Sequence, residues 1–207
     1  MNSKKSVAGI ILAAGMSRRF GKPKQLSTFQ GKTFLESVVD AALLSNLKHI
    51  VLVLGFSYDD VVRTLGTHRI KNRRLTILKN EAFRQGMSRS LQLGLKSVSD
   101  SFSAVMFLLG DQPLIRFETI NILLEAFSAG DKDICVPVYG NKRGNPTIFS
   151  RRLYPQLLST RGDSGGRNII RSNPDSVQEV DVDTPDVIID IDRPEDLDRL
   201  VRQYSLK

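Results

Sequence analysis

The chain has 207 residues, of which 41% are hydrophobic and 25% are charged. This length suits one domain over residues 1–207, and the composition excludes disordered and fibrous proteins. The formal net charge of +8 is compatible with nucleic acid, acidic lipid or an anionic small substrate as the partner, and also with solvated surface charge, so charge alone does not choose among them. No helix-turn-helix, zinc-finger or aromatic stacking motif accompanies the basic residues. We therefore expect a phosphate-rich small molecule as the partner, and no nucleic acid.

The first residues place two lysines ahead of an apolar run, as an export signal does. Gly9 interrupts this run and the loop at Gly15 ends it, so it is too short and too interrupted to cross a membrane. The single cysteine, Cys135, lies in another apolar run and is expected to be a buried thiol in a reducing compartment. These features predict a cytoplasmic protein without a membrane partner.

Apolar, β-prone runs alternate with helical patterns along the chain. The expected strands cover residues 7–12, 49–54, 75–78, 104–109 and 133–138, and the expected helices cover 34–44, 58–66, 87–97 and 117–127. Two further short strands, 177–182 and 187–191, precede a terminal helix near 195–204 that Pro194 opens. This alternation predicts an α/β fold of Rossmann-like type, in which helices cover both faces of a mostly parallel sheet to give three layers.

The loop after the first strand combines small residues with cations. Open parallel sheets bind ligands at the carboxyl ends of their strands, which gives this loop special weight. Its sequence LAAGMSRRFGKPKQL brings small residues for close backbone approach and four cations for phosphate oxygens, namely Arg18, Arg19, Lys22 and Lys24. The glycine spacing excludes a dinucleotide fingerprint and a P-loop. The loop predicts a triphosphate site, and a basic surface turn is the alternative.

Two acidic segments follow later strands. Asp111, in GDQP directly after the strand 104–109, is a natural Mg²⁺ ligand because that ion takes few protein carboxylates and completes its shell with water and phosphate. The alternative is a turn former or helix cap. Asp192 lies just before the terminal helix and is either a cap or a second metal ligand.

Several motifs together resemble a known family. The segments LAAGMSRRFGKPKQL, GDQPLI, RGNPTIF and DIDRPEDL occur in this order, with GDSGGR at 162–167. They resemble the molybdenum cofactor cytidylyltransferase family, within the nucleotidyltransferases of the nucleotide-diphospho-sugar transferase fold, from about residue 7 to 202. The resemblance implies that the terminal phosphate of molybdopterin attacks the α-phosphate of CTP, giving molybdopterin cytosine dinucleotide and pyrophosphate. It also implies a client such as xanthine dehydrogenase of purine catabolism, or the accessory chaperone of that client.

The resemblance assigns roles to individual residues. Nucleotide contacts would come from Leu12, Ala13, Ala14 and Gly15, from the stretch 85–90 with Gly86, Ser88 and Ser90, and from Gly110. Arg18 and Lys24 would bind the phosphates and act in catalysis with Asp111, which would hold Mg²⁺ with Asp192 as its partner. For Ser88, a helix cap is the alternative. Residues 143–146 would border the acceptor pocket, with Asn145 where many relatives have His.

Base choice and two other functions stay open at this stage. Related guanylyltransferases resemble LAGG where this chain has LAAG, so we hypothesise that the Ala14 methyl group occupies space that a purine would need. The same fold could instead act on a sugar 1-phosphate or another phosphorylated acceptor. A basic nucleotide- or RNA-binding module without catalysis is the alternative from a different class.

Overall fold

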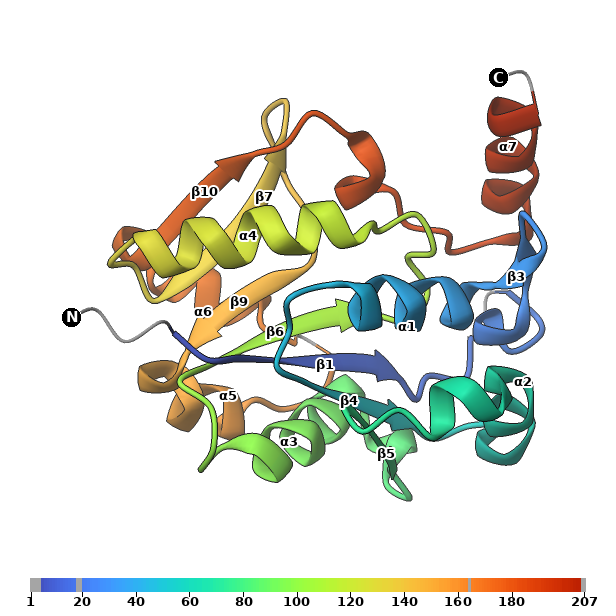
Figure 1. The fold of residues 1–207 in the computed structure, drawn as a ribbon, viewed down its shortest axis with the longest axis horizontal. Coiled ribbons are helices and arrows are strands. Elements are labelled where there is room, and N and C mark those ends of the chain that lie inside the picture. Colours follow the sequence, from blue (N-terminus) through green and yellow to red (C-terminus); the bar gives the residue numbers. More distant parts are fainter. Residues whose placement is uncertain (1–4, 18–19, 164, 206–207) are drawn as a thin grey trace.

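The computed structural model describes residues 5–17, 20–163 and 165–205. Its centre is an eight-stranded sheet in the order β10-β7-β9-β6-β1-β4-β5, with β8 paired to β7 (Figure 1). The strands are β1 Val7–Ala13, β4 His49–Leu54, β5 Leu75–Lys79, β6 Ala104–Leu109, β7 Ile134–Tyr139, β8 Lys142–Arg143, β9 Thr147–Ser150 and β10 Val177–Asp181. Within this sheet, as far as the chain is described, only the pairings of β9 and β8 are antiparallel. The sheet is therefore mostly parallel, as predicted.

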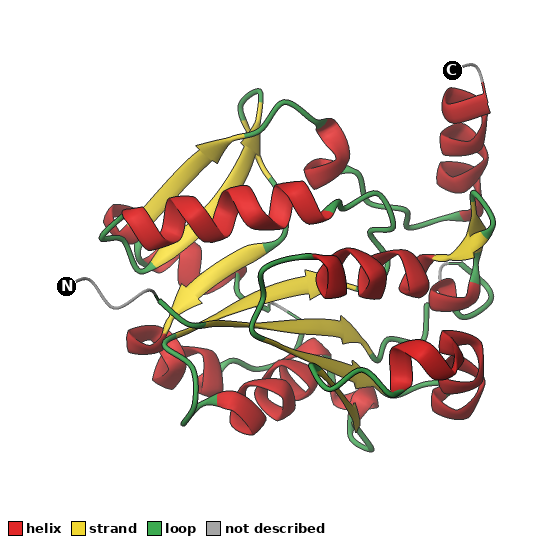
Figure 2. Ribbon diagram, in the orientation of Figure 1, coloured by secondary structure: helices red, strands yellow, loops and turns green. Residues whose placement is uncertain are grey.

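Helices cover both faces of the sheet (Figure 2). One face packs against α1 Phe34–Leu44, α2 Tyr58–Ile70 and α4 Phe117–Ala129, and the other against α3 Met87–Val98, α5 Tyr154–Ser159 and α6 Arg167–Ser172. Because side chains alternate along a strand, Ile11 joins the first core and its neighbour Ile10 joins the second. Both side chains are fully buried. The predicted three-layer α/β/α architecture is confirmed.

A third, smaller core lies at the carboxyl side of the sheet. The hairpin of β2 Thr28–Phe29 and β3 Lys32–Thr33 leads into α1, which begins with a capping box between Thr33 and Glu36. Helix α7, Pro194–Ser205, stands on the side to which the arrowheads of β1, β4 and β6 point (Figure 1). Its Leu200 packs with Phe20, Phe29 and Leu114. This core ties the loops after β1 and β6 to the C-terminal segment.

Among the described residues, the structure corrects one expected strand and adds four that were not expected, namely the two-residue strands β2, β3 and β8 and the longer β9. Residues 187–191 form no strand. The 3₁₀ helix η5, Pro185–Ile188, which the Thr184 side chain caps, covers the first two of these residues, and the Val187 carbonyl accepts a hydrogen bond from the Asn145 backbone N at 2.9 Å. Strand β9 was missed because its four residues, Thr147–Ser150, are too few to show a period. Helix α2 extends past its predicted end to Ile70, across a kink at Gly66.

Cys135 lies on β7 and is fully buried, as expected. Burial raises the pKa of its thiol to about 12, so the side chain behaves as a small apolar group rather than a nucleophile. Among the described residues, no helix has the length and hydrophobicity that a membrane-spanning segment needs.

Candidate active site

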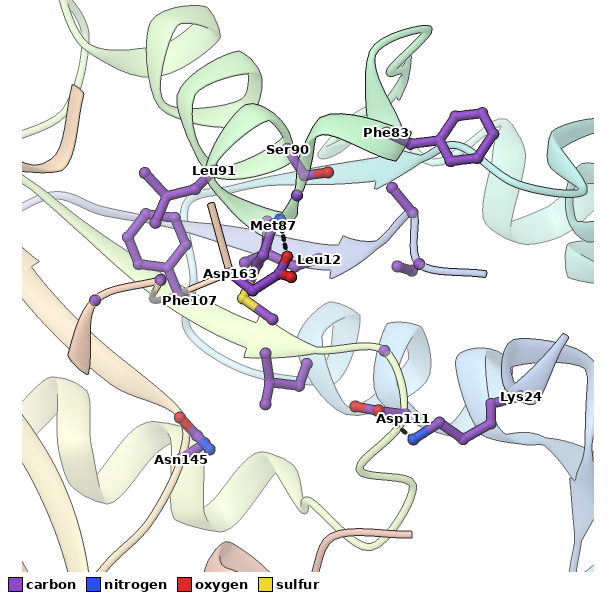
Figure 3. A pocket seen from close by; sticks show the side chains of 18 of the residues that line it. Leu12, Lys24, Phe83, Met87, Ser90, Leu91, Phe107, Asp111, Asn145 and Asp163 are labelled. Carbon is purple, nitrogen blue, oxygen red and sulfur yellow. Dashed lines mark hydrogen bonds and ion pairs between the residues drawn. The ribbon is translucent and has the colours of Figure 1, made fainter. Parts of the chain in front are cut away.

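The site lies where the chain diverges to either side of β1. From β1 the chain continues to β4 on one side, whereas β6 pairs with β1 on the other. Such a switch point leaves a crevice at the carboxyl ends of the strands. A cleft of about 860 Å³ opens there (Figure 3), lined by residues 12–17 at the end of β1 and beyond it, by residues 109–111 at the end of β6 and beyond it, and by residues of α3 and α6. The predicted nucleotide loop and Asp111 thus face one cavity.

Two glycines of the cleft have different roles. A Cβ atom built on Gly110 would lie 2.6 Å from the Cβ of Ala13, and the Gly110 backbone N donates to the Leu12 carbonyl at 3.0 Å. Only glycine permits this approach of the two loops. A Cβ atom on Gly15 would meet no heavy atom within 4 Å. The backbone at Gly15 is therefore open to a ligand, whereas Gly110 allows the loop after β6 to pack closely against the end of β1.

Gln25 shapes the first loop, and sequence reasoning gave it no role. Its side chain is buried, and its Nε2 atom donates to the carbonyls of Ala13 at 2.9 Å and Gly15 at 3.0 Å. These bonds fold the loop back on itself around the two small residues. Nothing in the sequence marks this role, because the contacts exist only once the chain has turned. Arg18 and Arg19, from the same loop, lie outside the described residues.

Lys24 brings together the two predicted acidic segments. Its Nζ atom lies 2.8 Å from Oδ2 of Asp111, 3.1 Å from Oδ1 of Asp192 and 2.7 Å from the Ile191 carbonyl oxygen (Figure 3 shows Lys24 and Asp111). The Lys24 side chain is 9% exposed, whereas those of Asp111 and Asp192 are 38% and 40% exposed. The cation is therefore buried, while the two carboxylates that contact it are exposed to solvent in the cleft.

The carboxylates of Asp111 and Asp192 stabilise the charged form of Lys24. Burial by itself lowers the pKa of the Lys24 ammonium, but the charge and hydrogen bond of Asp111, and then those of Asp192, outweigh burial and raise that pKa. Lys24 is accordingly a cation at neutral pH, held by two anions. Two carboxylates that share one cation also fit the donor set that Mg²⁺ takes from proteins. No three His, Cys, Asp or Glu side chains of the described ranges form a metal-binding group.

The wall opposite β6 is the start of α3. Gly86 has a φ of 103°, and a Cβ atom there would lie 2.8 Å from the Gly162 carbonyl group, so glycine is required. The Met87 backbone N donates to Oδ1 of Asp163 at 2.9 Å (Figure 3). Ser88 is buried in the first turn and does not cap the helix, because Gly86 holds the cap position. Ser90 lines the cleft, and Asn80 Nδ2 donates to its hydroxyl at 2.9 Å.

The far side of the cleft comes from the second half of the chain. Asn145 lines it, and its backbone is fixed by Val187. Gln112 Nε2 donates to Oδ1 of Asp190 at 2.8 Å and so ties the loop after β6 to the segment before α7. Asp163 and Arg167 also line the cleft, although sequence reasoning gave neither a role of its own. The motif GDSGGR was the available signal, since it contains both residues.

Comparison with known proteins assigns the family. The family model described as the MobA-like NTP transferase domain matches residues 9–179. The chain is similar to "Nicotine blue oxidoreductase" of Paenarthrobacter nicotinovorans, at 28% identity over 94% of this chain and 96% of the relative. It is also similar to "Purine catabolism protein PucB" of Bacillus subtilis, at 24% identity over 95% and 97%, and to "Molybdenum cofactor cytidylyltransferase" of Escherichia coli, at 24% identity over 95% and 96%.

Solved structures agree with this assignment. The fold matches Rv0371c of Mycobacterium tuberculosis in complex with manganese, with a TM-score of 0.79 at 26% identity over 95% of this chain and 98% of that one. Because the family model spans most of the chain, including the loop after β1 and Asp111 after β6, the chain belongs to the MobA-like NTP transferase family of nucleotidyltransferases.

Proposed function

We propose that this transferase moves CMP from CTP to the terminal phosphate of molybdopterin, with Mg²⁺ held by Asp111 and Asp192. The observation that carries the proposal is the convergence of these two carboxylates at the mouth of the cleft, beside the loop of residues 12–17. A cleft that joins open backbone to a carboxylate pair suits a metal-bound triphosphate. The relative named a molybdenum cofactor cytidylyltransferase, matched over nearly its whole length, supports this choice of substrates.

The reaction requires no nucleophile or general base from the protein. A phosphate acceptor is already ionised at neutral pH, so positioning and charge neutralisation provide most of the catalysis. Gly15 gives the triphosphate access to the backbone, while Lys24 and Arg18 supply positive charge. Asp111 and Asp192 would hold the metal ion. A divalent ion bound there would neutralise the charge that builds up on the leaving pyrophosphate.

The other residues that line the cleft would contact the nucleoside and the acceptor. In this proposal, residues 12–15 and the start of α3, with Gly86 and Ser90, surround the nucleoside. Asn145 borders the pocket of the acceptor. The client that receives the finished cofactor is a hydroxylase of the xanthine dehydrogenase kind or its accessory chaperone, and the relative named a purine catabolism protein supports that choice.

A substrate panel tests the proposal. Pyrophosphate release is measured with CTP, GTP, ATP and UTP, each with molybdopterin, with a sugar 1-phosphate, or with no acceptor. We expect release from CTP only when molybdopterin is present. Release with the sugar phosphate would assign another acceptor within the same family. Nucleotide binding without release would contradict catalysis and favour a binding module. Because one relative is named an oxidoreductase, turnover of a nicotinamide cofactor without pyrophosphate release would contradict the proposal as well.

A further inference from the structure

The ammonium group of Lys24 has all three of its N–H donors in use within the protein. An ammonium has three donors and no acceptor, and those of Lys24 go to Asp111 Oδ2 at 2.8 Å, Ile191 O at 2.7 Å and Asp192 Oδ1 at 3.1 Å. No donor is therefore left for a triphosphate in this arrangement. The two carboxylates, in turn, already share a cation at the place where a metal would bridge them.

From this we infer that Lys24 is a resident cation that a divalent metal and a triphosphate displace together. The metal takes the carboxylates of Asp111 and Asp192, and the Lys24 ammonium moves to phosphate oxygens. This inference rests on the proposed function and gives that site an order of events. A divalent ion held by both carboxylates would repel an ammonium group that lies 2.8 Å and 3.1 Å from their oxygen atoms, because like charges repel strongly at short range.

The structure permits the ammonium to move while the loop stays in place. The Lys24 backbone N donates to Ser17 Oγ at 3.1 Å, and the Lys24 carbonyl accepts from the Ser27 backbone N at 2.9 Å. The backbone of Asp192 is also held, because its N donates to Asp196 Oδ2 at 3.0 Å. The flexible four-carbon stem of lysine can therefore redirect its charge without a change in the backbone.

The exchange has a thermodynamic consequence. Without nucleotide, the metal must compete with a bound ammonium and binds weakly. A triphosphate offers the ammonium new acceptors and thereby strengthens metal binding, and by reciprocity the metal strengthens triphosphate binding to the same extent. Removal of the Lys24 charge should consequently raise the affinity of the nucleotide-free protein for the metal. A lysine whose role was to hold the carboxylates together would have the opposite effect when it is removed.

Mn²⁺ binding to the full chain without nucleotide tests the exchange. Free Mn²⁺ is followed by electron paramagnetic resonance for the wild type, Lys24→Met and Lys22→Met. Lys22 is exposed in the same loop, so its variant removes the same charge without emptying the position between the carboxylates. We expect Lys24→Met to bind Mn²⁺ roughly tenfold more tightly than the wild type, within the usual range of coupling between sites. The Lys22→Met variant should show a much smaller gain.

Equal or weaker Mn²⁺ binding by Lys24→Met than by Lys22→Met would overturn the exchange and make Lys24 the organiser of the carboxylate pair. Thermal unfolding verifies that each variant is folded, and Lys24→Gln replaces Lys24→Met if the latter is not. Asp111→Asn separates this inference from the proposed function. If it abolishes Mn²⁺ binding while Lys24→Met brings no gain, the metal site stands and the exchange fails. If Lys24→Met brings the gain but the wild type releases no pyrophosphate, the exchange stands and the proposed reaction fails.

Discussion

The ammonium of Lys24 lies 2.8 Å from the carboxylate of Asp111, although the two residues are 87 positions apart in the chain. Lys24 opens the 3₁₀ helix η1, Lys24–Leu26, and Asp111 follows the buried strand β6. Their contact joins the nucleotide loop to the expected metal ligand.

Asp111→Asn should abolish most of the turnover and leave the fold intact. The amide keeps the shape of the side chain but loses the charge that holds the metal, and loss of such electrostatic stabilisation costs on the order of 100-fold or more in rate. Pyrophosphate release at saturating CTP measures the effect. Asp131→Asn, at an exposed position after α4, is the matched control and should retain wild-type turnover. Wild-type turnover in Asp111→Asn, or in the native enzyme with EDTA, would contradict the metal assignment.

Gly110→Ala and Gly15→Ala should differ in what they damage. The new methyl group at position 110 would lie 2.6 Å from the Cβ of Ala13, so the loops must separate, and overpacking of this kind costs roughly 1–3 kcal/mol of stability. Position 15 has open space, so Gly15→Ala should keep the wild-type Tm and instead raise the KM for CTP. Thermal unfolding and steady-state kinetics of both variants check this. Equal Tm values for the two variants would refute the packing argument.

Ala14→Gly should lower the preference for CTP over GTP. A methyl-sized contact is worth roughly 1–3 kcal/mol of discrimination, about 10- to 200-fold. Ala14 is 5% exposed, and a Cβ atom built on Gly55 would lie 2.9 Å from the Ala14 methyl group, so much of this methyl group packs against Gly55 and little of it faces the cleft. We therefore expect a change near the lower end of that range. The ratio of the two kcat/KM values, compared between variant and wild type, decides it. An unchanged ratio would place base selection elsewhere in the cleft.

Asp40 should contribute stability that is lost in acid. Burial alone raises the pKa of this carboxyl, but hydrogen bonds from Arg69 and Lys32 outweigh burial and lower that pKa below its ordinary value of 3.8. The carboxyl therefore stabilises the fold above about pH 3.8, and the contribution disappears as the pH falls through the lowered pKa. Asp40→Asn should cost roughly 1.5–3 kcal/mol at pH 7, the range for a hydrogen bond to a charged group, because it leaves the buried Arg69 with one acidic partner fewer.

Urea unfolding at pH 7 and near pH 2 measures this difference. As the pH falls through the lowered pKa of the wild-type carboxyl, the difference in stability between the variant and the wild type should shrink. Asp60→Asn removes an exposed ion pair with Arg63 and serves as the control, with an expected change of less than about 1 kcal/mol. A penalty for Asp40→Asn that stays constant with pH would show that shape, rather than charge, accounts for the effect.

The sequence by itself determined the parallel part of the sheet and the edge at which the site lies. Runs such as 49–54 and 104–109 are apolar throughout, as strands covered on both faces require, and the intervening helices show their own period. From this local pattern it follows that the loop after β1 and Asp111 after β6 share one edge. The cleft that both of them line bears this out.

Only the tertiary structure decided which of these residues meet. The Lys24 side chain donates a hydrogen bond to Asp192, which is 168 positions away in the sequence. The Met87 backbone N donates to Asp163, 76 positions away. The Val187 carbonyl accepts a hydrogen bond from Asn145 instead of from a strand partner. Hydrophobic periodicity indicates which face of a helix or strand is buried, but it does not predict contacts between loops that are distant in the sequence. The partner of the Lys24 ammonium depends on how the third core packs α7 against the hairpin of β2 and β3, and that packing exists only in the folded chain.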